Sequence, residues 1–219
     1  MNLPPLHEKL LADIIDLGSP YPLVLTGGYA VQAHGLVERF SRDLDVATEN
    51  PAPMREIVAS LTAGLTERGW QTTHVQTDPL SGRFLVTDPA TGEECEVDVL
   101  KEAFWAPPAQ TPYGPVLSLD DVIGTKVRAL ADRGTVRDLI DVQAAARHRS
   151  LADLESLGRR RAQDEFSLAD LRDRLTGADW YEDEDYTAYG LTPRQVAELK
   201  TWAVEWATDL GERLHEEDC

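Results

Sequence analysis

The chain has few cysteines, no clustered histidines and no long apolar segment. Its 219 residues include two cysteines, Cys95 and Cys219, which form neither a disulfide framework nor a metal site, and its five histidines are scattered without metal-ligand spacing. No apolar run approaches the ~18 residues of a membrane-spanning helix. The N-terminus lacks the basic flank and apolar core of a signal peptide. We therefore expect a cytoplasmic protein without a membrane span.

The chain is also short of basic residues. Lys and Arg number 21 against 39 Asp and Glu, which gives a net charge of −18. This balance argues against a nucleic-acid substrate, because phosphate contacts need local positive charge. Residues 123–161 are the exception, with nine basic and five acidic residues, whereas residues 162–219 hold 16 acids and five bases. The arginines of the basic stretch are either an RNA-binding surface or ordinary solvated helix faces.

Two glycines after an apolar stretch indicate a phosphate-binding turn. Residues 23–25 have the pattern of a buried strand, Gly27 and Gly28 follow, and residues 29–36 have the pattern of a helix. Glycine lets backbone amides approach an anion closely, and the N-terminus of a helix adds a favourable dipole. The alternative is that the two glycines form only a turn.

Spaced carboxylates predict a metal site beside this turn. Asp43 and Asp45 are two residues apart, so a strand would place both on one face. The acids of residues 94–100 alternate in the same way, and Asp98 would complete a cluster if the two strands were neighbours. Such a cluster could hold one or two divalent ions and accept a proton from an attacking hydroxyl. Periodicity does not separate Asp98 from the two glutamates on its face, and solvated edge strands would show the same pattern.

These motifs resemble a known group of enzymes. Gly-Gly, an interval of 14 residues, Asp-x-Asp and a later strand carboxylate resemble the signature of the DNA polymerase β-like nucleotidyltransferases. Residues 41–45 (Ser-Arg-Asp-Leu-Asp) are similar to the AbiEii/AbiGii toxin family, which includes the MenT toxins of mycobacteria. So are Lys126 and residues 137–141 (Arg-Asp-Leu-Ile-Asp). The resemblance covers roughly residues 20–150.

The resemblance implies transfer of a nucleoside monophosphate from a nucleoside triphosphate to an acceptor hydroxyl. It implies Mg²⁺ or Mn²⁺ as cofactor, the 3′ end of tRNA as acceptor and a cognate antitoxin as partner. The implied metal ligands are Asp43, Asp45 and Asp98, the last as ligand or base. The implied nucleotide-binding residues are Gly27, Gly28, Ser41, Arg42 and Lys126.

Lys126 and the two aspartates of residues 137–141 have a second interpretation. Lys126 could be an ordinary surface lysine in the middle of a helix, and Arg137 and Asp141 could form an intrahelical ion pair. In the family, the lysine contacts the phosphates, and an aspartate in this segment supports the active site. We expect this aspartate to be Asp141 rather than Asp138.

Three other functions fit the sequence. The enzyme could modify a small molecule, as antibiotic adenylyltransferases do, and the acidic body would suit a cationic aminoglycoside. It could instead transfer AMP to a protein side chain. A non-catalytic binding module is the third alternative, although the joint presence of Asp43, Asp45, Asp98 and Lys126 argues against it.

The expected fold is α/β (α+β): a polymerase β-like nucleotidyltransferase fold with a small mixed sheet, flanking helices and a C-terminal helical region. Residues 1–117 would form the nucleotidyltransferase core with the Gly-Gly and Asp-x-Asp motifs, and residues 118–219 the helical region with the lysine and Arg-Asp-x-x-Asp motifs. The patterns predict strands near residues 22–26, 43–48, 70–77, 82–87 and 94–100. They predict helices over residues 4–17, 53–67, 119–132, 135–148, 151–163, 167–175 and 193–215. Residues 106–115 read as a proline-punctuated loop, and Trp180–Tyr186 as a solvated acidic loop or a surface for docking another protein.

Overall fold

A computed structural model of the chain describes residues 3–39, 41–162 and 166–217. The chain divides into two compact units, Met1–Val122 and Ile123–Cys219. Cys219 and the end of the helix predicted over residues 151–163 lie outside the described residues. Of the helices described, none has both the length and the hydropathy that a membrane crossing requires.

The first unit is built on a mixed sheet of seven strands in the order β3-β4-β5-β2-β1-β7-β6. β2 runs parallel to β5 and β1 runs parallel to β7, whereas the other neighbours are antiparallel. The strands are β1 (Val24–Leu25), β2 (Leu44–Thr48), β3 (Gln71–Thr77), β4 (Ser81–Thr87), β5 (Glu94–Lys101), β6 (Ala109–Thr111) and β7 (Gly114–Val116).

The two faces of this sheet differ in chemistry. The helices of the unit are α1 (Pro5–Leu17), α2 (Gly27–Ala33), α3 (Met54–Glu67) and the first residues of α4 (Leu119–Arg133). Phe84, Val97 and Val99 are fully buried on one face, and α3 covers that face, since a Cβ on Gly82 would meet Val58 and Met54 of α3. Burial of these apolar side chains stabilises the unit. The opposite face carries the polar residues that alternate with them.

Two local predictions for this unit are wrong. Residues 106–115 are not only a loop, because they contain the hairpin of β6 and β7. Val116 pairs with Leu25 of β1 and is fully buried, a long-range contact that local composition does not reveal. The glycine helix runs over Gly27–Ala33 rather than residues 29–36, so it begins at the glycines themselves.

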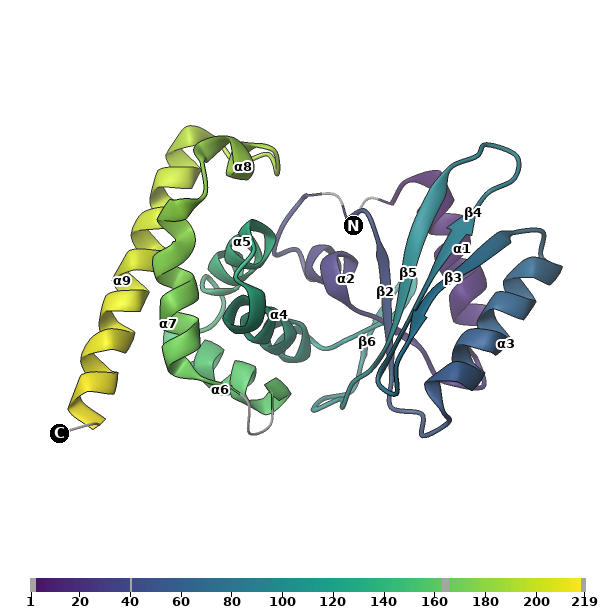
Figure 1. The fold of residues 1–219 in the computed structure, drawn as a ribbon, viewed down its shortest axis with the longest axis horizontal. Coiled ribbons are helices and arrows are strands. Elements are labelled where there is room, and N and C mark those ends of the chain that lie inside the picture. Colours follow the sequence, from purple (N-terminus) through teal and green to yellow (C-terminus); the bar gives the residue numbers. More distant parts are fainter. Residues whose placement is uncertain (1–2, 40, 163–165, 218–219) are drawn as a thin grey trace. The chain divides into compact units, whose positions relative to one another are not determined.

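Within residues 123–162 and 166–217, every regular element of the second unit is a helix, as predicted. It contains the remainder of α4 with α5 (Val136–Ala145), α6 (Leu151–Ala162), α7 (Leu168–Thr176), η2 (Gly177–Trp180), α8 (Asp183–Thr187) and α9 (Pro193–Glu217). α7 and α9 pack along each other (Figure 1). The prediction of a solvated loop over Trp180–Tyr186 is wrong for its second half. Tyr186 is fully buried in α8 and donates a hydrogen bond to Ala178 O at 2.8 Å, whereas the Trp180 side chain is exposed.

Candidate active site

The parallel pair of β2 and β5 places two of the predicted carboxylates side by side. Asp45 is paired with Asp98 in the register of the two strands, and both residues are partly exposed. Asp43 is partly exposed and lies in the bend just before β2, two residues from Asp45. The two strands are therefore neighbours, which the predicted cluster requires.

The glycine pair packs directly against this cluster. Gly27 has φ +60°, and a Cβ at this position would lie 1.9 Å from Asp45 Oδ2. A Cβ on Gly28 would lie 2.5 Å from Ser41 Oγ. Any side chain at either position would therefore displace its neighbour or strain the backbone. The structure therefore brings Gly27 against Asp45 and Gly28 against Ser41.

A chain of hydrogen bonds supports the segment that carries Asp43. Ser41 Oγ donates to Asp43 O at 3.3 Å, and Tyr29 Oη donates to Ser41 O at 3.0 Å. His7 Nδ1 of α1 hydrogen-bonds in turn to Tyr29 Oη, and both side chains are buried. Burial lowers the pKa of His7 although the nearby Asp43 acts in the opposite direction, and burial raises the pKa of Tyr29. Nothing in the local sequence marks His7 as a site residue, because a lone histidine in an amphipathic helix has no distinguishing pattern.

The lowered pKa of His7 makes stability depend on pH. Below its ordinary pKa of 6.5 the unfolded chain takes up a proton that the folded chain does not, so the free energy of unfolding should fall as pH falls. The slope should reach at most about 1.4 kcal/mol per pH unit for this one proton. Urea titrations of wild type and His7→Gln at several pH values would measure it. His7→Gln should lose this slope and His74→Gln, at an exposed position, should keep it; equal slopes in all three would contradict the expectation.

Asp98 has a partner, Arg83, that was not predicted from the sequence. Arg83 of β4 lies opposite Asp98 in the antiparallel register, and its Nε and Nη2 donate to Asp98 Oδ1 and Oδ2 at 2.7 and 2.8 Å. Arg83 Nη1 also lies 3.2 Å from Glu96 Oε1. The hydrogen bonds to Asp98 raise the pKa of Arg83. The turn between the strands predicted over residues 82–87 and 94–100 sets the register of the hairpin. Its position could therefore have predicted that Arg83 lies opposite Asp98.

The three predicted carboxylates have the chemistry of divalent-cation ligands, but their side chains are not arranged around a common point. Asp43, Asp45 and Asp98 offer hard oxygen ligands from adjacent strands, the type that Mg²⁺ and Mn²⁺ prefer. Across residues 3–39, 41–162 and 166–217, however, no three His, Cys, Asp or Glu side chains are arranged to hold an ion. Asp98 is turned toward Arg83. The donor set fits the cation, and the side chains would have to rotate to bind it.

The second unit pairs the predicted lysine with the favoured aspartate. Lys126 Nζ of α4 lies 3.0 Å from Asp141 Oδ2 of α5, and the side chains are 11% and 0% exposed. Lys126 is therefore not an ordinary surface lysine. Asp138 binds elsewhere: Arg133 donates to both of its oxygens and Thr135 to one. Burial alone would raise the pKa of Asp138, but these hydrogen bonds hold it below the usual value.

Two arginines lie close in sequence to the glycine helix and β2. Arg42, a predicted nucleotide-binding residue, is exposed. Arg39 was not predicted, yet its Nη1 lies 3.7 Å from the position that a Cβ on Gly28 would occupy. A guanidinium beside the glycine pair is a suitable phosphate ligand. Arg39 is therefore a candidate phosphate ligand, as is Arg42. In the sequence, its position two residues before Ser41 could have indicated this role.

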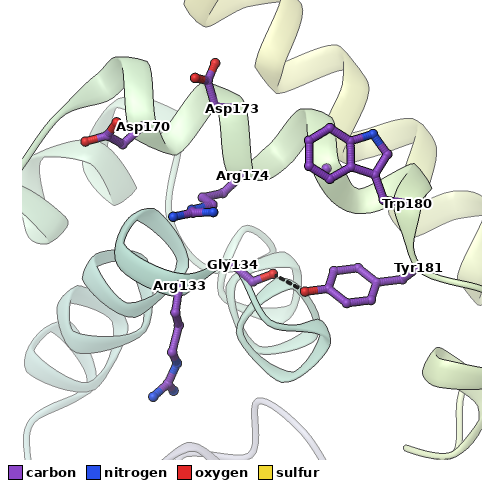
Figure 2. Close-up of a pocket in the computed structure, with 8 residues that line it drawn as sticks. Arg133, Gly134, Asp170, Asp173, Arg174, Trp180 and Tyr181 are labelled. Atoms are coloured by element: carbon purple, nitrogen blue, oxygen red, sulfur yellow. Dashed lines mark hydrogen bonds between the residues drawn. The ribbon is translucent and has the colours of Figure 1, made fainter.

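The second unit also has a pocket with a volume of about 490 Å³ (Figure 2). Its lining residues are Arg133, Gly134, Asp170, Asp173, Arg174, Gly177, Trp180 and Tyr181. Tyr181 Oη donates to Gly134 O at 2.9 Å, and Arg174 points toward Gly134 and donates to Asp132 O. None of the predicted site residues lines this pocket, so it is separate from the candidate site.

Comparisons with known proteins show the family of the chain. Residues 9–210 match the family model described as "Nucleotidyl transferase AbiEii toxin, Type IV TA system". None of the curated proteins compared with the chain matches it.

Two solved structures are similar in fold. JHP933 from Helicobacter pylori is 19% identical with a TM-score of 0.55, covering 99% of this chain and 98% of its own. MenT4, a nucleotidyltransferase toxin of Mycobacterium tuberculosis, is 18% identical with a TM-score of 0.59, covering 93% of this chain and 83% of its own. The expected fold class, a polymerase β-like nucleotidyltransferase fold, is thereby confirmed. The chain is a nucleotidyltransferase and belongs to the AbiEii family of nucleotidyl transferase toxins.

Proposed function

We propose that this enzyme transfers a nucleoside monophosphate from a nucleoside triphosphate to the 3′-terminal hydroxyl of tRNA, as the toxin of a toxin–antitoxin pair. The observation that carries the proposal is the pairing of Asp45 with Asp98, with the backbone of Gly27 packed against Asp45. Carboxylates beside a glycine turn are what a metal–triphosphate site needs. Family membership supports nucleotide transfer, and the tRNA acceptor is the finer part of the proposal.

The proposed reaction is a single displacement at the α-phosphorus. The acceptor oxygen forms a bond to this phosphorus while the bond to the β-phosphate oxygen breaks, and pyrophosphate leaves. The proton of the acceptor hydroxyl passes to a carboxylate, for which Asp98 is the candidate base. Asp43, Asp45 and Asp98 would hold a Mg²⁺ or Mn²⁺ ion, which when bound neutralises phosphate charge.

The remaining residues bind and orient the nucleotide. The backbone at Gly27 and Gly28 would approach the phosphates, with Ser41 and Arg42 as further ligands. Lys126 would offset the charge that develops on the leaving pyrophosphate. Its ion pair with the buried Asp141 supports this role, because the contact holds a flexible side chain in one orientation.

Two candidate functions differ in the acceptor, which is either RNA or a cationic small molecule. The basic stretch of residues 123–161 favours RNA, whereas the net charge of −18 favours a cationic small molecule such as an aminoglycoside. Incubation of the enzyme with α-labelled nucleoside triphosphates and total RNA, and in parallel with an aminoglycoside, would test the proposal directly. Label should appear on tRNA; label on an aminoglycoside and none on RNA would reject the tRNA acceptor.

The salt dependence of transfer offers a second test. If RNA is the acceptor, the apparent KM for RNA should rise with salt, with a log–log slope of about 0.7 per phosphate contact. Of the three consecutive arginines of α6, Arg159 and Arg160 are exposed but Arg161 is buried, so only the first two are candidate contacts. Charge reversal at Arg161 would damage the core rather than test RNA binding. Arg159→Glu/Arg160→Glu should raise the KM for RNA by about tenfold and leave nucleotide affinity unchanged.

The control for this test is the exposed Arg194 of α9, at which the same reversal should have a small effect. Transfer that is insensitive to salt and unchanged by the double reversal would rule against RNA. The small-molecule acceptor would then become the preferred function.

A further inference from the structure

Arg83 occupies both oxygens of a carboxylate that the proposed reaction needs. Its Nε and Nη2 bind Asp98 in a two-pronged contact at 2.7 and 2.8 Å. Antiparallel pairing of β4 and β5 places the two residues directly opposite each other, so this contact follows from the register of the sheet. A two-pronged arginine–carboxylate contact is strong and specific in geometry.

Glu96 gives Arg83 a second partner on the same strand as Asp98. The third nitrogen of the guanidinium, Nη1, lies 3.2 Å from Glu96 Oε1. Glu96 and Asp98 are two residues apart in β5 and therefore share a face. The Arg83 side chain is 46% exposed, so it has room to shift between the two carboxylates.

Arg83 also offsets the electrostatic repulsion between the carboxylates of Asp45 and Asp98. Asp45 lies opposite Asp98 on the other side, in β2, and like-charged carboxylates at such a position destabilise each other without a cation. Arg83 supplies positive charge at Asp98, where a divalent cation would supply it in the loaded enzyme. A cation that binds Asp98 must therefore do so against the nearby charge of Arg83.

We infer that Arg83 is an internal counter-ion that competes with the divalent cation for Asp98 and is retained by Glu96 when the cation binds. This inference rests on the proposed function of the site. It gives separate roles to two acids that sequence periodicity could not distinguish: Asp98 turns to the cation, and Glu96 holds the displaced guanidinium. Arg83 is thus a positioning residue that sets the cation affinity of the site.

Titration of the full-length protein with Mn²⁺ in the absence of nucleotide, followed by the electron paramagnetic resonance signal of free Mn²⁺, tests the inference. Arg83→Gln should bind Mn²⁺ about tenfold more tightly than wild type, because the guanidinium that engages both oxygens of Asp98 is removed and Asp98 is released to the cation. Glu96→Gln should bind it several-fold more weakly, because Arg83 loses the neighbouring carboxylate of β5 that would hold it away from Asp98. Arg83→Gln/Asp98→Asn should bind no more tightly than Asp98→Asn alone.

Arg68→Gln is the matched control, since Arg68 forms an ion pair with Asp13 and Asp16 in the same unit. It should leave Mn²⁺ affinity unchanged. If Arg83→Gln folds and binds Mn²⁺ no more tightly than wild type, the inference is overturned. If Arg83→Gln does not fold, Glu96→Gln decides: Mn²⁺ binding that is as tight as in wild type, or tighter, overturns the inference. Wild type that neither binds Mn²⁺ nor transfers nucleotides would instead reject the proposed function itself, whereas normal wild-type binding and transfer with no effect at Arg83 rejects only the inference.

Discussion

An Asp45→Asn enzyme should lose nucleotidyl transfer by about a thousandfold or more and keep its fold. Asp45 is the carboxylate that lies against the backbone of Gly27 and opposite Asp98, so its loss removes a proposed ligand at the centre of the cluster. Asparagine keeps the size of the side chain and so preserves the close packing with Gly27. Thermal unfolding should show equal or higher stability, because one of several neighbouring negative charges is gone.

Initial rates with Mg²⁺ and labelled nucleotide would measure this loss, with circular dichroism to establish folding. Asp78→Asn is the control, at an exposed carboxylate between β3 and β4 that contacts Gln76. It should retain wild-type rates. Normal turnover by Asp45→Asn would show that the chemistry occurs elsewhere.

Loss of the Lys126–Asp141 ion pair should affect both stability and activity. Lys126→Gln removes the ammonium group that lies 3.0 Å from Asp141 Oδ2, and the Asp141 side chain is 0% exposed. Breaking a buried pair by removing one partner costs about 3–5 kcal/mol of unfolding free energy. Activity should fall as well, because the proposed phosphate ligand is removed. Urea unfolding and rates measured over a range of nucleotide concentrations would record both effects.

A double variant separates the structural role of this pair from the catalytic role. Lys126→Gln/Asp141→Asn removes both charges, so it should recover much of the lost stability but none of the lost activity. Lys200→Gln is the control, since Lys200 forms a more exposed ion pair with Asp183 in the same unit. Lys101 of β5 is unsuitable as a control, because it donates hydrogen bonds to Asn50 O and Ala52 O. If the double variant bound the nucleotide as tightly as wild type, the role of Lys126 would be structural only.

The sequence alone was sufficient for the elements whose pattern is local. Alternation located β2 and β5 and assigned Asp43, Asp45 and Asp98 to polar faces, because side chains in a strand alternate with a period of two. Helical periodicity located α4 and α5, which carry Lys126 and Asp141. The glycine pair was also evident, since few other residues tolerate a positive φ beside a carboxylate.

The tertiary structure decided everything that depends on pairing between distant segments. β6 and β7 exist because β7 pairs with β1, a contact that spans 91 residues from Leu25 to Val116 and leaves no local signal. The partner of Lys126 is Asp141 because Asp138 binds Arg133 and Thr135, and local spacing allowed either. Arg83 reaches Asp98 only through the register of β4 and β5. Periodicity determines which face a side chain occupies, but the identity of its neighbour on that face depends on strand order, register and helix packing, which arise only when the whole chain buries its core.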